Sequence, residues 1–269
     1  MGWPEWLLLA LIGALTGALL VRAPWWPVTF AALVVSFGYG TLLHRTTAGS
    51  RLRLFGNFCL AWMIYAGSTA VIEALRLPLH HHALLTVERS WFGETPSVVS
   101  SAWLPVGLAE VLSAAYLSYQ IHLHWAFIDA LFRDDLWRRR LSQSTFPAFA
   151  IGLAGFFLLP ASVPSVAFPE LFSRPITGGW LTHFDDLLNH HAAARYDAFP
   201  SLHVLITLCL LTFDWRYFRL RFWIMLAPAL LMLPATIALR LHYAVDLLAS
   251  FVLFALLLVI GRMVEARTT

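Results

Sequence analysis

Long apolar segments alternate with short polar connections along the whole 269-residue chain. Most of these segments approach the roughly 20 residues that an α-helix needs to cross about 30 Å of hydrocarbon. The pattern predicts eight membrane-spanning helices, over residues 5–21, 25–43, 54–75, 104–131, 146–161, 203–213, 222–239 and 243–260. The fifth and sixth segments are short, as is typical of helices whose ends open onto a buried or water-lined site.

Composition supports the same fold class. Hydrophobic residues make up 59% of the chain and charged residues 12%, a balance far from that of soluble domains. The first apolar run lacks the basic flank and the small-residue cleavage site of a signal peptide, so we expect it to remain as the first span. No internal repeat or flexible linker interrupts the pattern. We therefore expect a single all-α domain over residues 1–269, a polytopic membrane helical bundle.

The arginines predict how the bundle lies in the membrane. All 18 basic residues are Arg, and the alternating connections divide them into sets of 12 and 6. Because cytoplasmic loops carry the excess of positive charge, both termini are expected in the cytoplasm. Loop 162–202 and the turn around His242 then face the extracytoplasmic side.

Two of the loops contain clusters of histidine. Loop 76–103, which we expect to include an amphipathic interfacial helix, has His80, His81 and His82, and loop 162–202 has His190 and His191. Adjacent side chains rarely converge on one metal ion, and no Cys or His-Glu-x-x-His framework accompanies them. We expect these histidines at the level of the lipid headgroups.

Carboxylates also lie in or near the predicted spans. Such groups are costly in lipid, so Glu73, Glu110 and Asp129 are either functional or paired. Helical spacing favours pairs of Glu73 with Arg76 and of Asp129 with Arg133.

The first motif with catalytic potential is HYAVD at residues 242–246, at the start of the last apolar run. On a helix, His242 and Asp246 lie one turn apart on the same face. The carboxylate can then accept the proton of one imidazole nitrogen, which fixes the tautomer and leaves the other nitrogen free to attack. The alternative is a His–Asp pair that only seals a helix end.

The second motif is FPSLH at residues 199–203, which opens the sixth predicted span. Pro200 is favoured in a first helical turn, and Ser201 adds a hydroxyl beside the free backbone N–H groups there. Such a helix N-terminus is a ready site for an anion. His203 can act as a general acid on a leaving oxygen while His242 attacks phosphorus.

Together the two motifs resemble the PSxH and His-x-x-x-Asp motifs of the type 2 phosphatidic acid phosphatase superfamily. FPSLHV (199–204), HYAVDLLAS (242–250) and LLPASVPS (158–165) look most like the branch with inositol phosphorylceramide synthases and, more distantly, sphingomyelin synthases. The resemblance implies a six-helix core over residues 54–260, preceded by two extra spans in residues 1–50. It also implies His242 as nucleophile, Asp246 as its orienting partner, His203 as the acid, and a reaction without metal or other cofactor.

The sequence departs from the superfamily pattern in its cationic residues. The pattern has a Lys and an Arg before PSxH and a Ser-Arg pair before the second His, but this chain has no Lys and has Thr236 six positions before His242. Positive charge for a phosphate is therefore expected from Arg240, Arg195 and Arg174, each of which also fits a purely topological role. We expect at least two of them to matter, together with the Ser201 hydroxyl.

These observations predict a membrane enzyme that acts on lipids through a phospho-histidine. With a lipid alcohol as acceptor it is a phosphotransferase of the inositolphosphotransferase kind, whose donor is a lipid phosphate or a phospholipid. With water as acceptor it is a lipid phosphate phosphatase. A non-catalytic lipid-binding or transport protein is the second alternative. Nothing in the sequence indicates nucleic-acid binding.

Overall fold

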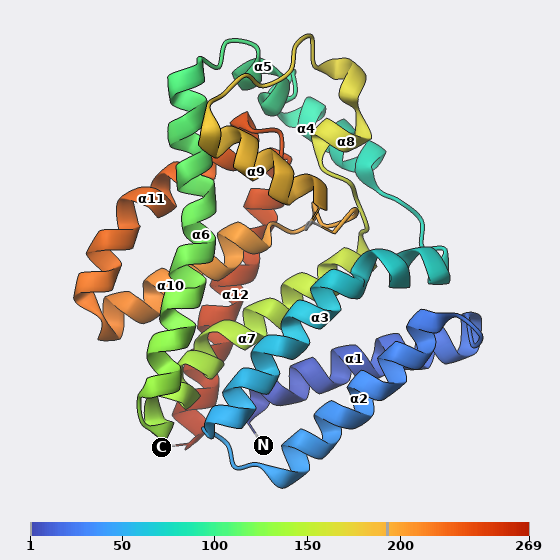
Figure 1. Ribbon diagram of the computed structural model, residues 1–269, viewed down its shortest axis with the longest axis vertical. Helices are drawn as coiled ribbons and strands as arrows, with labels where there is room; N and C mark the ends of the chain where they lie inside the picture. The colour runs from blue at the N-terminus through green and yellow to red at the C-terminus, as the bar shows by residue number, and fades with distance from the viewer. Residues whose placement is uncertain (1, 192–193, 269) are drawn as a thin grey trace.

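The computed structural model describes residues 2–191 and 194–268, and most of them are helical (Figure 1). The helices, in chain order, are α1 (Trp3–Arg22), α2 (Pro27–Arg45), α3 (Arg51–Leu75), α4 (His81–Phe92), α5 (Pro96–Ser101), α6 (Val106–Phe132), α7 (Asp135–Leu158), α8 (Pro164–Ala167), the 3-10 helix η1 (Pro169–Leu171), α9 (Trp180–His191), α10 (Leu202–Tyr217), α11 (Arg219–Ala238) and α12 (Ala244–Thr268). The predicted all-α class is confirmed.

Six of these helices, α1, α2, α3, α7, α11 and α12, are long and apolar enough to cross a membrane. The protein is therefore a multi-pass integral membrane protein. The other two predicted spans are also helical, as α6 and α10. Helix α6 has 27 residues but contains several polar side chains, whereas α10 has only 16 residues. Both helices border the candidate site, which explains why they are less apolar or shorter than ordinary spans.

The fifth predicted span was wrong at its start. The apolar pattern placed it at residues 146–161, yet α7 begins eleven residues earlier, at Asp135. The side chain of Asp134 caps this helix by accepting hydrogen bonds from the backbone N–H groups of Leu136 and Trp137. Pro147 consequently lies inside a continuous helix, and the polar first turns were not visible to a search for apolar runs.

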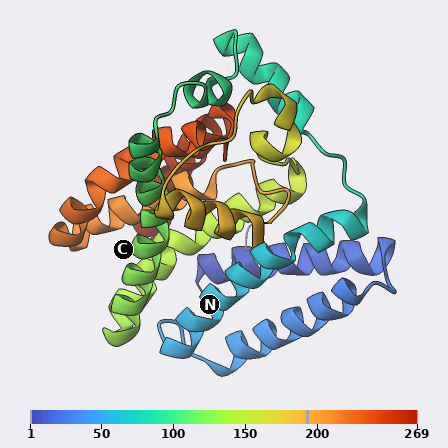
Figure 2. The ribbon, with the colours of Figure 1, turned by 45° about the horizontal axis from the view of Figure 1, so that its top comes forward.

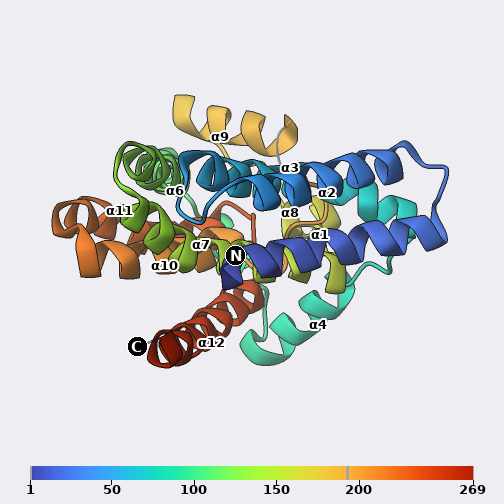
Figure 3. The same cartoon turned by 90° about the horizontal axis from the view of Figure 1, so that it is seen from below.

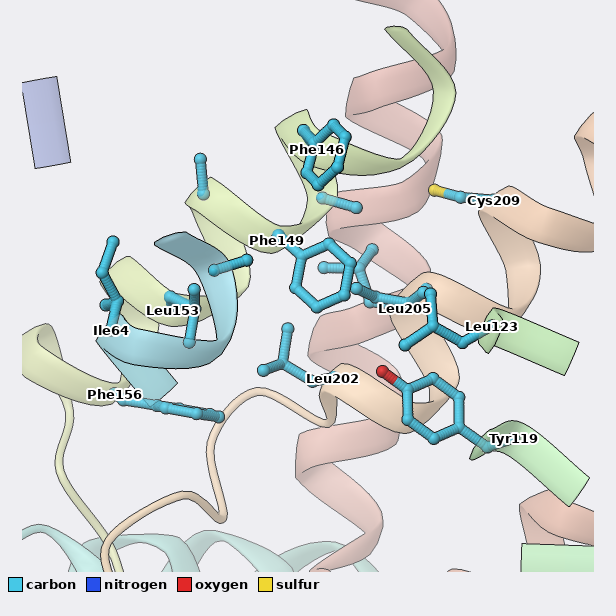
Figure 4. Close-up of a cluster of buried hydrophobic side chains, with 14 of the residues drawn as sticks. Ile64, Tyr119, Leu123, Phe146, Phe149, Leu153, Phe156, Leu202, Leu205 and Cys209 are labelled. Carbon is cyan, nitrogen blue, oxygen red and sulfur yellow. The ribbon is translucent and has the colours of Figure 1, made fainter. Parts of the chain in front are cut away.

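Helix α7 lies at the centre of the bundle, where α1, α3, α10 and α12 all pack against it. Figure 4 shows Phe149 and Phe156 of α7 in a cluster with Leu202 at the start of α10. Two glycines of α7 make this contact close: a Cβ at Gly152 would overlap Leu202, and one at Gly155 would overlap Pro200. Small residues allow two helices to approach closely in a membrane, and here they bring the start of α10 against α7.

The remaining elements divide the molecule into two ends and one flank. Helices α4, α5, α8 and α9 gather at one end, whereas the start of α1 and the end of α12 lie at the other (Figure 1). Helices α1 and α2 form a hairpin that packs along α3 on one flank of the bundle (Figure 2). Having both chain ends on one side agrees with an even number of spans.

A buried ionic network joins α6, α10 and α11. Asp214 is fully buried and accepts hydrogen bonds from Arg221 Nε at 2.9 Å and from His122 Nε2 at 2.8 Å. Arg221 also reaches Asp129 at 3.1 Å, and Arg133 pairs with Asp129 at 2.9 Å, which confirms the predicted pairing. Charges in such surroundings are tolerated only when partners offset their lost hydration.

Replacing Asp214 by Ala should lower the free energy of unfolding by about 3–5 kcal/mol, because Arg221 would remain as a buried charge without its main partner. Thermal unfolding of the detergent-solubilised protein measures the loss. Glu94→Ala removes an exposed loop carboxylate and serves as the control, with an expected change of about 0.5 kcal/mol or less. An Asp214 variant as stable as this control would contradict a structural role for the network.

Candidate active site

The turn between α11 and α12 sets the position of His242. Arg240 adopts a left-handed conformation with φ of 63°, and the backbone N–H groups of Leu241 and His242 both donate to the carbonyl of Thr236, at 2.9 and 3.0 Å. This tight reversal turns the chain back into the bundle, so that only 3% of His242 is exposed.

Two hydrogen-bond acceptors lie near one ring nitrogen of His242, Nδ1. Its Nδ1 lies 2.9 Å from the carbonyl oxygen of Ala198 and 3.4 Å from Oδ2 of Asp246. Because a carbonyl oxygen can only accept, Nδ1 carries the proton and Nε2 keeps a free lone pair. Asp246 Oδ2 also accepts the backbone N–H of Tyr243 at 2.8 Å, so the carboxylate stabilises the turn as well as the ring.

Backbone contacts hold the segment before α10 against the rest of the bundle. The N–H of Ala198 donates to the carbonyl of Ala161 at 3.0 Å, within an isolated parallel bridge between Ala161 and Asp197. The hydroxyl of Ser250 on α12 donates to the carbonyl of Ser201 at 3.0 Å. These bonds fix the Ala198 carbonyl relative to α12 and hence to His242.

His203 lies in the first turn of α10, across from His242. Ser201 is fully buried and caps this helix, with its hydroxyl oxygen 3.5 Å from the N–H of Val204. The imidazole lies between Tyr116 and Tyr119 of α6, with ring centroids 4.6 and 4.7 Å away. The His203 and His242 rings are 5.8 Å apart, which allows both to flank one phosphorus atom.

The three candidate arginines occupy two places. Arg240 is buried, donates from Nη2 to the carbonyl of Arg174 at 2.8 Å, and lies over the ring of Phe172. Burial and the nearby Arg174 charge lower the pKa of Arg240. Arg195 is exposed, and its backbone N–H donates to the hydroxyl of Thr69 on α3. The structure therefore brings Arg240 and Arg174 together and leaves Arg195 apart from them.

Asp197 is a site residue that the sequence reasoning missed. Its Oδ2 accepts a hydrogen bond from the Tyr65 hydroxyl at 2.7 Å, and it bridges to Ala161 beside the Ala198 carbonyl. Burial raises the pKa of Asp197, while the Tyr65 hydrogen bond and the charge of His242 oppose that rise. The available signal was an acidic residue six positions before His203, in a loop already rich in polar residues.

Glu88 on α4 is a second missed residue. It is fully buried, and its Oε1 accepts the N–H of Ala244 at 2.6 Å, at the start of α12. Burial raises the pKa of Glu88 to about 7, with a further contribution from Asp246, while the Ala244 hydrogen bond opposes the rise. Glu88 lies four residues after Leu84 and therefore on the buried face of the predicted amphipathic helix. A carboxylate at that position of the apolar face was the available signal in the sequence.

The histidines of α4 pack against Phe168, which lies in the same buried cluster as Ala198 and Tyr243. The rings of His81 and His82 both pack edge-on against Phe168, with centroids 5.6 and 5.0 Å from it. Burial and the neighbouring His82 lower the pKa of His81. The side chains of His190 and His191 lie outside the described part of the chain, so the expectation for them stays a prediction.

Comparison with protein families places these residues in one matched region. Residues 82–260, more than half of the chain, match the model of a family described as the PAP2 superfamily. This region contains His203, His242 and Asp246. Comparisons with curated protein sequences and with solved structures gave no match.

Asp246→Asn should lower the turnover number about 100-fold or more with little change in KM. The expectation follows if His242 is the nucleophile, as the sequence resemblance implies: the carboxylate would stabilise the positive imidazole ring formed when Nε2 attacks, and an amide lacks that charge. Steady-state kinetics on a lipid phosphate substrate measure the effect, with the exposed Asp186→Asn as the control. Full turnover in the Asp246 variant would mean that the Ala198 carbonyl alone suffices to prepare His242.

The raised pKa of Glu88 predicts a pH dependence of stability. Between the ordinary value of 4.5 and about 7, the folded state holds a proton that the unfolded state has released. The free energy of unfolding should therefore fall as the pH rises through this window. Glu88→Gln lacks this titration, so its melting temperature should gain on that of the wild type between about pH 5 and pH 8. A difference that stays constant with pH would contradict this assignment.

Proposed function

Because the chain belongs to the PAP2 superfamily, we propose that it is a membrane enzyme that transfers a phosphoryl or phospho-headgroup between lipids through His242. The observation that carries the proposal is the hydrogen bond from His242 Nδ1 to the Ala198 carbonyl, which leaves Nε2 unprotonated in a ring whose centroid lies 5.8 Å from that of His203. A nucleophile held in one tautomer beside a second imidazole is the equipment that a phospho-histidine mechanism needs.

In the first half-reaction, Nε2 of His242 attacks phosphorus and forms a P–N bond. The bond between phosphorus and the leaving oxygen breaks, and His203 gives that oxygen its proton, so that the lipid alcohol leaves neutral. Asp246 stabilises the positive charge that develops on the His242 ring. Its Oδ2 lies 3.4 Å from Nδ1, close enough for this interaction to strengthen as the ring becomes charged.

In the second half-reaction, an acceptor hydroxyl attacks the phospho-histidine and the P–N bond breaks. His203, now neutral, takes the acceptor's proton and returns to its starting state, while His242 recovers its lone pair. A lipid alcohol as acceptor gives a new phospholipid, whereas water gives free phosphate or a free phospho-headgroup. We favour the lipid alcohol, because His203 borders a cavity of about 320 Å³ with largely apolar walls, far larger than one water molecule requires.

Charge on the transferring phosphoryl group needs fixed donors. We assign this role to Arg240 and Arg174, which lie together, with the Ser201 hydroxyl and the N-terminus of α10 as further hydrogen-bond donors. Arg195 is the third candidate. Removing one preorganised donor of this kind typically costs about 2.7–4 kcal/mol of transition-state stabilisation. From the distribution of arginines along the sequence, we infer that the site faces the extracytoplasmic side.

The test uses the purified, detergent-solubilised protein with lipid phosphates and phospholipids as donors and lipid alcohols as acceptors. We expect a new phospholipid with little free phosphate, and a loss of about 1,000-fold or more in His242→Ala. His183→Ala, which removes an exposed histidine of α9, is the matched control and should keep full activity.

The outcomes separate the alternatives. Release of phosphate without transfer, lost in His242→Ala, would make the protein a lipid phosphate phosphatase. Activity that survives in His242→Ala would rule out a phospho-histidine on that residue. A folded wild-type protein that binds lipid but turns over none of these substrates would favour the non-catalytic alternative.

A further inference from the structure

The cavity beside His203 lies between α3, α6, α9 and α10 and has a volume of about 320 Å³. His203 forms part of its wall together with Tyr65, Tyr116 and Tyr119, whereas His242, Asp246 and the candidate arginines are not among the residues that line it. The cavity therefore reaches His203, which exchanges a proton with the alcohol in the proposed mechanism, and the arginines assigned to the phosphoryl group do not line it.

The polar groups in the cavity wall are unsuited to phosphate. Apart from the tyrosines and His203, they are Trp62, Gln120, Asp185 and Asn189, and none of the described residues that line the space is an Arg. Phosphate sites in proteins depend on cations and N–H donors, and a carboxylate would repel the anion. A neutral part of a lipid, with hydroxyl or amide donors of its own, matches this wall instead.

Helix α9 covers the cavity and is firmly attached to α6. The Glu110 carboxylate of α6 accepts the backbone N–H groups of Gly179, Leu181 and Thr182, at 2.8, 3.1 and 2.8 Å, and the Thr182 hydroxyl at 2.6 Å. A carboxylate at a helix N-terminus satisfies its free N–H groups and is favoured by the helix dipole. Glu110, one of the carboxylates that the sequence placed in or near a membrane span, is therefore paired with the N-terminus of α9 rather than with an arginine.

The two faces of α9 have opposite character. Trp180, Phe184 and Leu187 point outward with 73%, 39% and 54% of their surface exposed, and the first two rings are stacked. Asp185 and Asn189 point inward and line the cavity. Figure 3 shows α9 lying alone across the outside of α3 and α6. An aromatic outer face of this kind suits the lipid interface, so the cavity lies directly beneath a surface that contacts lipid.

Asp185 and Asn189 form one hydrogen-bonded pair. The Asn189 amide nitrogen donates to the Asp185 carboxylate at 3.0 Å and to its carbonyl at 2.9 Å, and Asp185 is only 4% exposed. Burial raises the pKa of Asp185 to about 7. Because both amide N–H groups are engaged within the pair, Oδ1 of Asn189 and the ionised Asp185 carboxylate remain as acceptors.

We propose that this cavity holds the alcohol part of the lipid substrate, and that Asp185 and Asn189 select lipids with a free hydroxyl or amide N–H beside the phosphate-bearing carbon. This inference rests on the proposed function, because the oxygen that leaves phosphorus takes its proton from His203 and must lie on that side. A lipid that lacks such a donor leaves the buried acceptors without a partner, and sites built around a hydrogen bond reject such analogues strongly.

Two substrates that differ by one hydroxyl test the proposal: a 1-acylglycerol 3-phosphate and its 2-deoxy analogue. We expect the wild type to prefer the hydroxylated lipid by about 10-fold or more in kcat/KM. Asp185→Leu should reduce this preference to about 3-fold or less by losing activity on the hydroxylated lipid only, and Asp185→Asn, which keeps an acceptor oxygen, should retain part of it. Asp186→Leu changes an exposed residue on the same helix and should leave the preference intact.

Binding of the neutral alcohols to the His242→Ala protein gives a readout that needs no turnover. The shift in melting temperature with 1-acylglycerol should exceed that with its 2-deoxy analogue, and Asp185→Leu in the same background should abolish the difference. Equal treatment of both lipids by the wild type, or an equal loss on both in Asp185→Leu, would overturn the inference and leave the proposed function standing. Preferential binding without any phosphate transfer by the wild type would instead overturn the proposed function and leave the cavity as a binding site for such alcohols.

Discussion

A single backbone carbonyl, that of Ala198, fixes which nitrogen of His242 carries the proton, and much of the surrounding structure holds that carbonyl in place. The bridge to Ala161 ties it to the end of α7, and the Ser250 hydroxyl ties the following residues to α12. A hydrogen bond in a site of low dielectric is strong when its geometry is good and costly when it is not. The position of two chain segments, more than the identity of any side chain, therefore sets the tautomer of His242.

Helix α7 has the same importance for packing. Without Cβ atoms at Gly152 and Gly155, Leu202 and Pro200 approach its backbone closely, and this contact positions the turn in which Ser201 and His203 lie. In lipid, helices gain little from the hydrophobic effect when they associate, so close van der Waals packing and internal hydrogen bonds are the main stabilising forces. The apolar cluster around Phe149 thus stabilises the bundle and sets the geometry of the candidate site together.

The sequence was informative where a single segment determines the structure. Apolar length predicted the membrane helices, the PSxH and His-x-x-x-Asp spacings predicted the superfamily, and helical spacing predicted the pair of Asp129 with Arg133. The sequence was not informative where a residue's partner is distant along the chain or is a backbone group. The Ala198 carbonyl has no signature in residue type, and Glu88 meets Ala244 only through the packing of α4 on α12. The early start of α7 was hidden because a polar cap, rather than an apolar run, begins that helix.

The hydrogen bond from Ala244 to Glu88 also has a consequence for biogenesis. The ribosome releases α4 long before α12, so Glu88 cannot accept the hydrogen bond from Ala244 until seven further helices and η1 have been made. His242 and Asp246 are synthesised with that same last segment, and only then can the carboxylate of α4 bind the start of α12. Under the proposed mechanism, a nascent chain therefore has no nucleophile until its final span has been made.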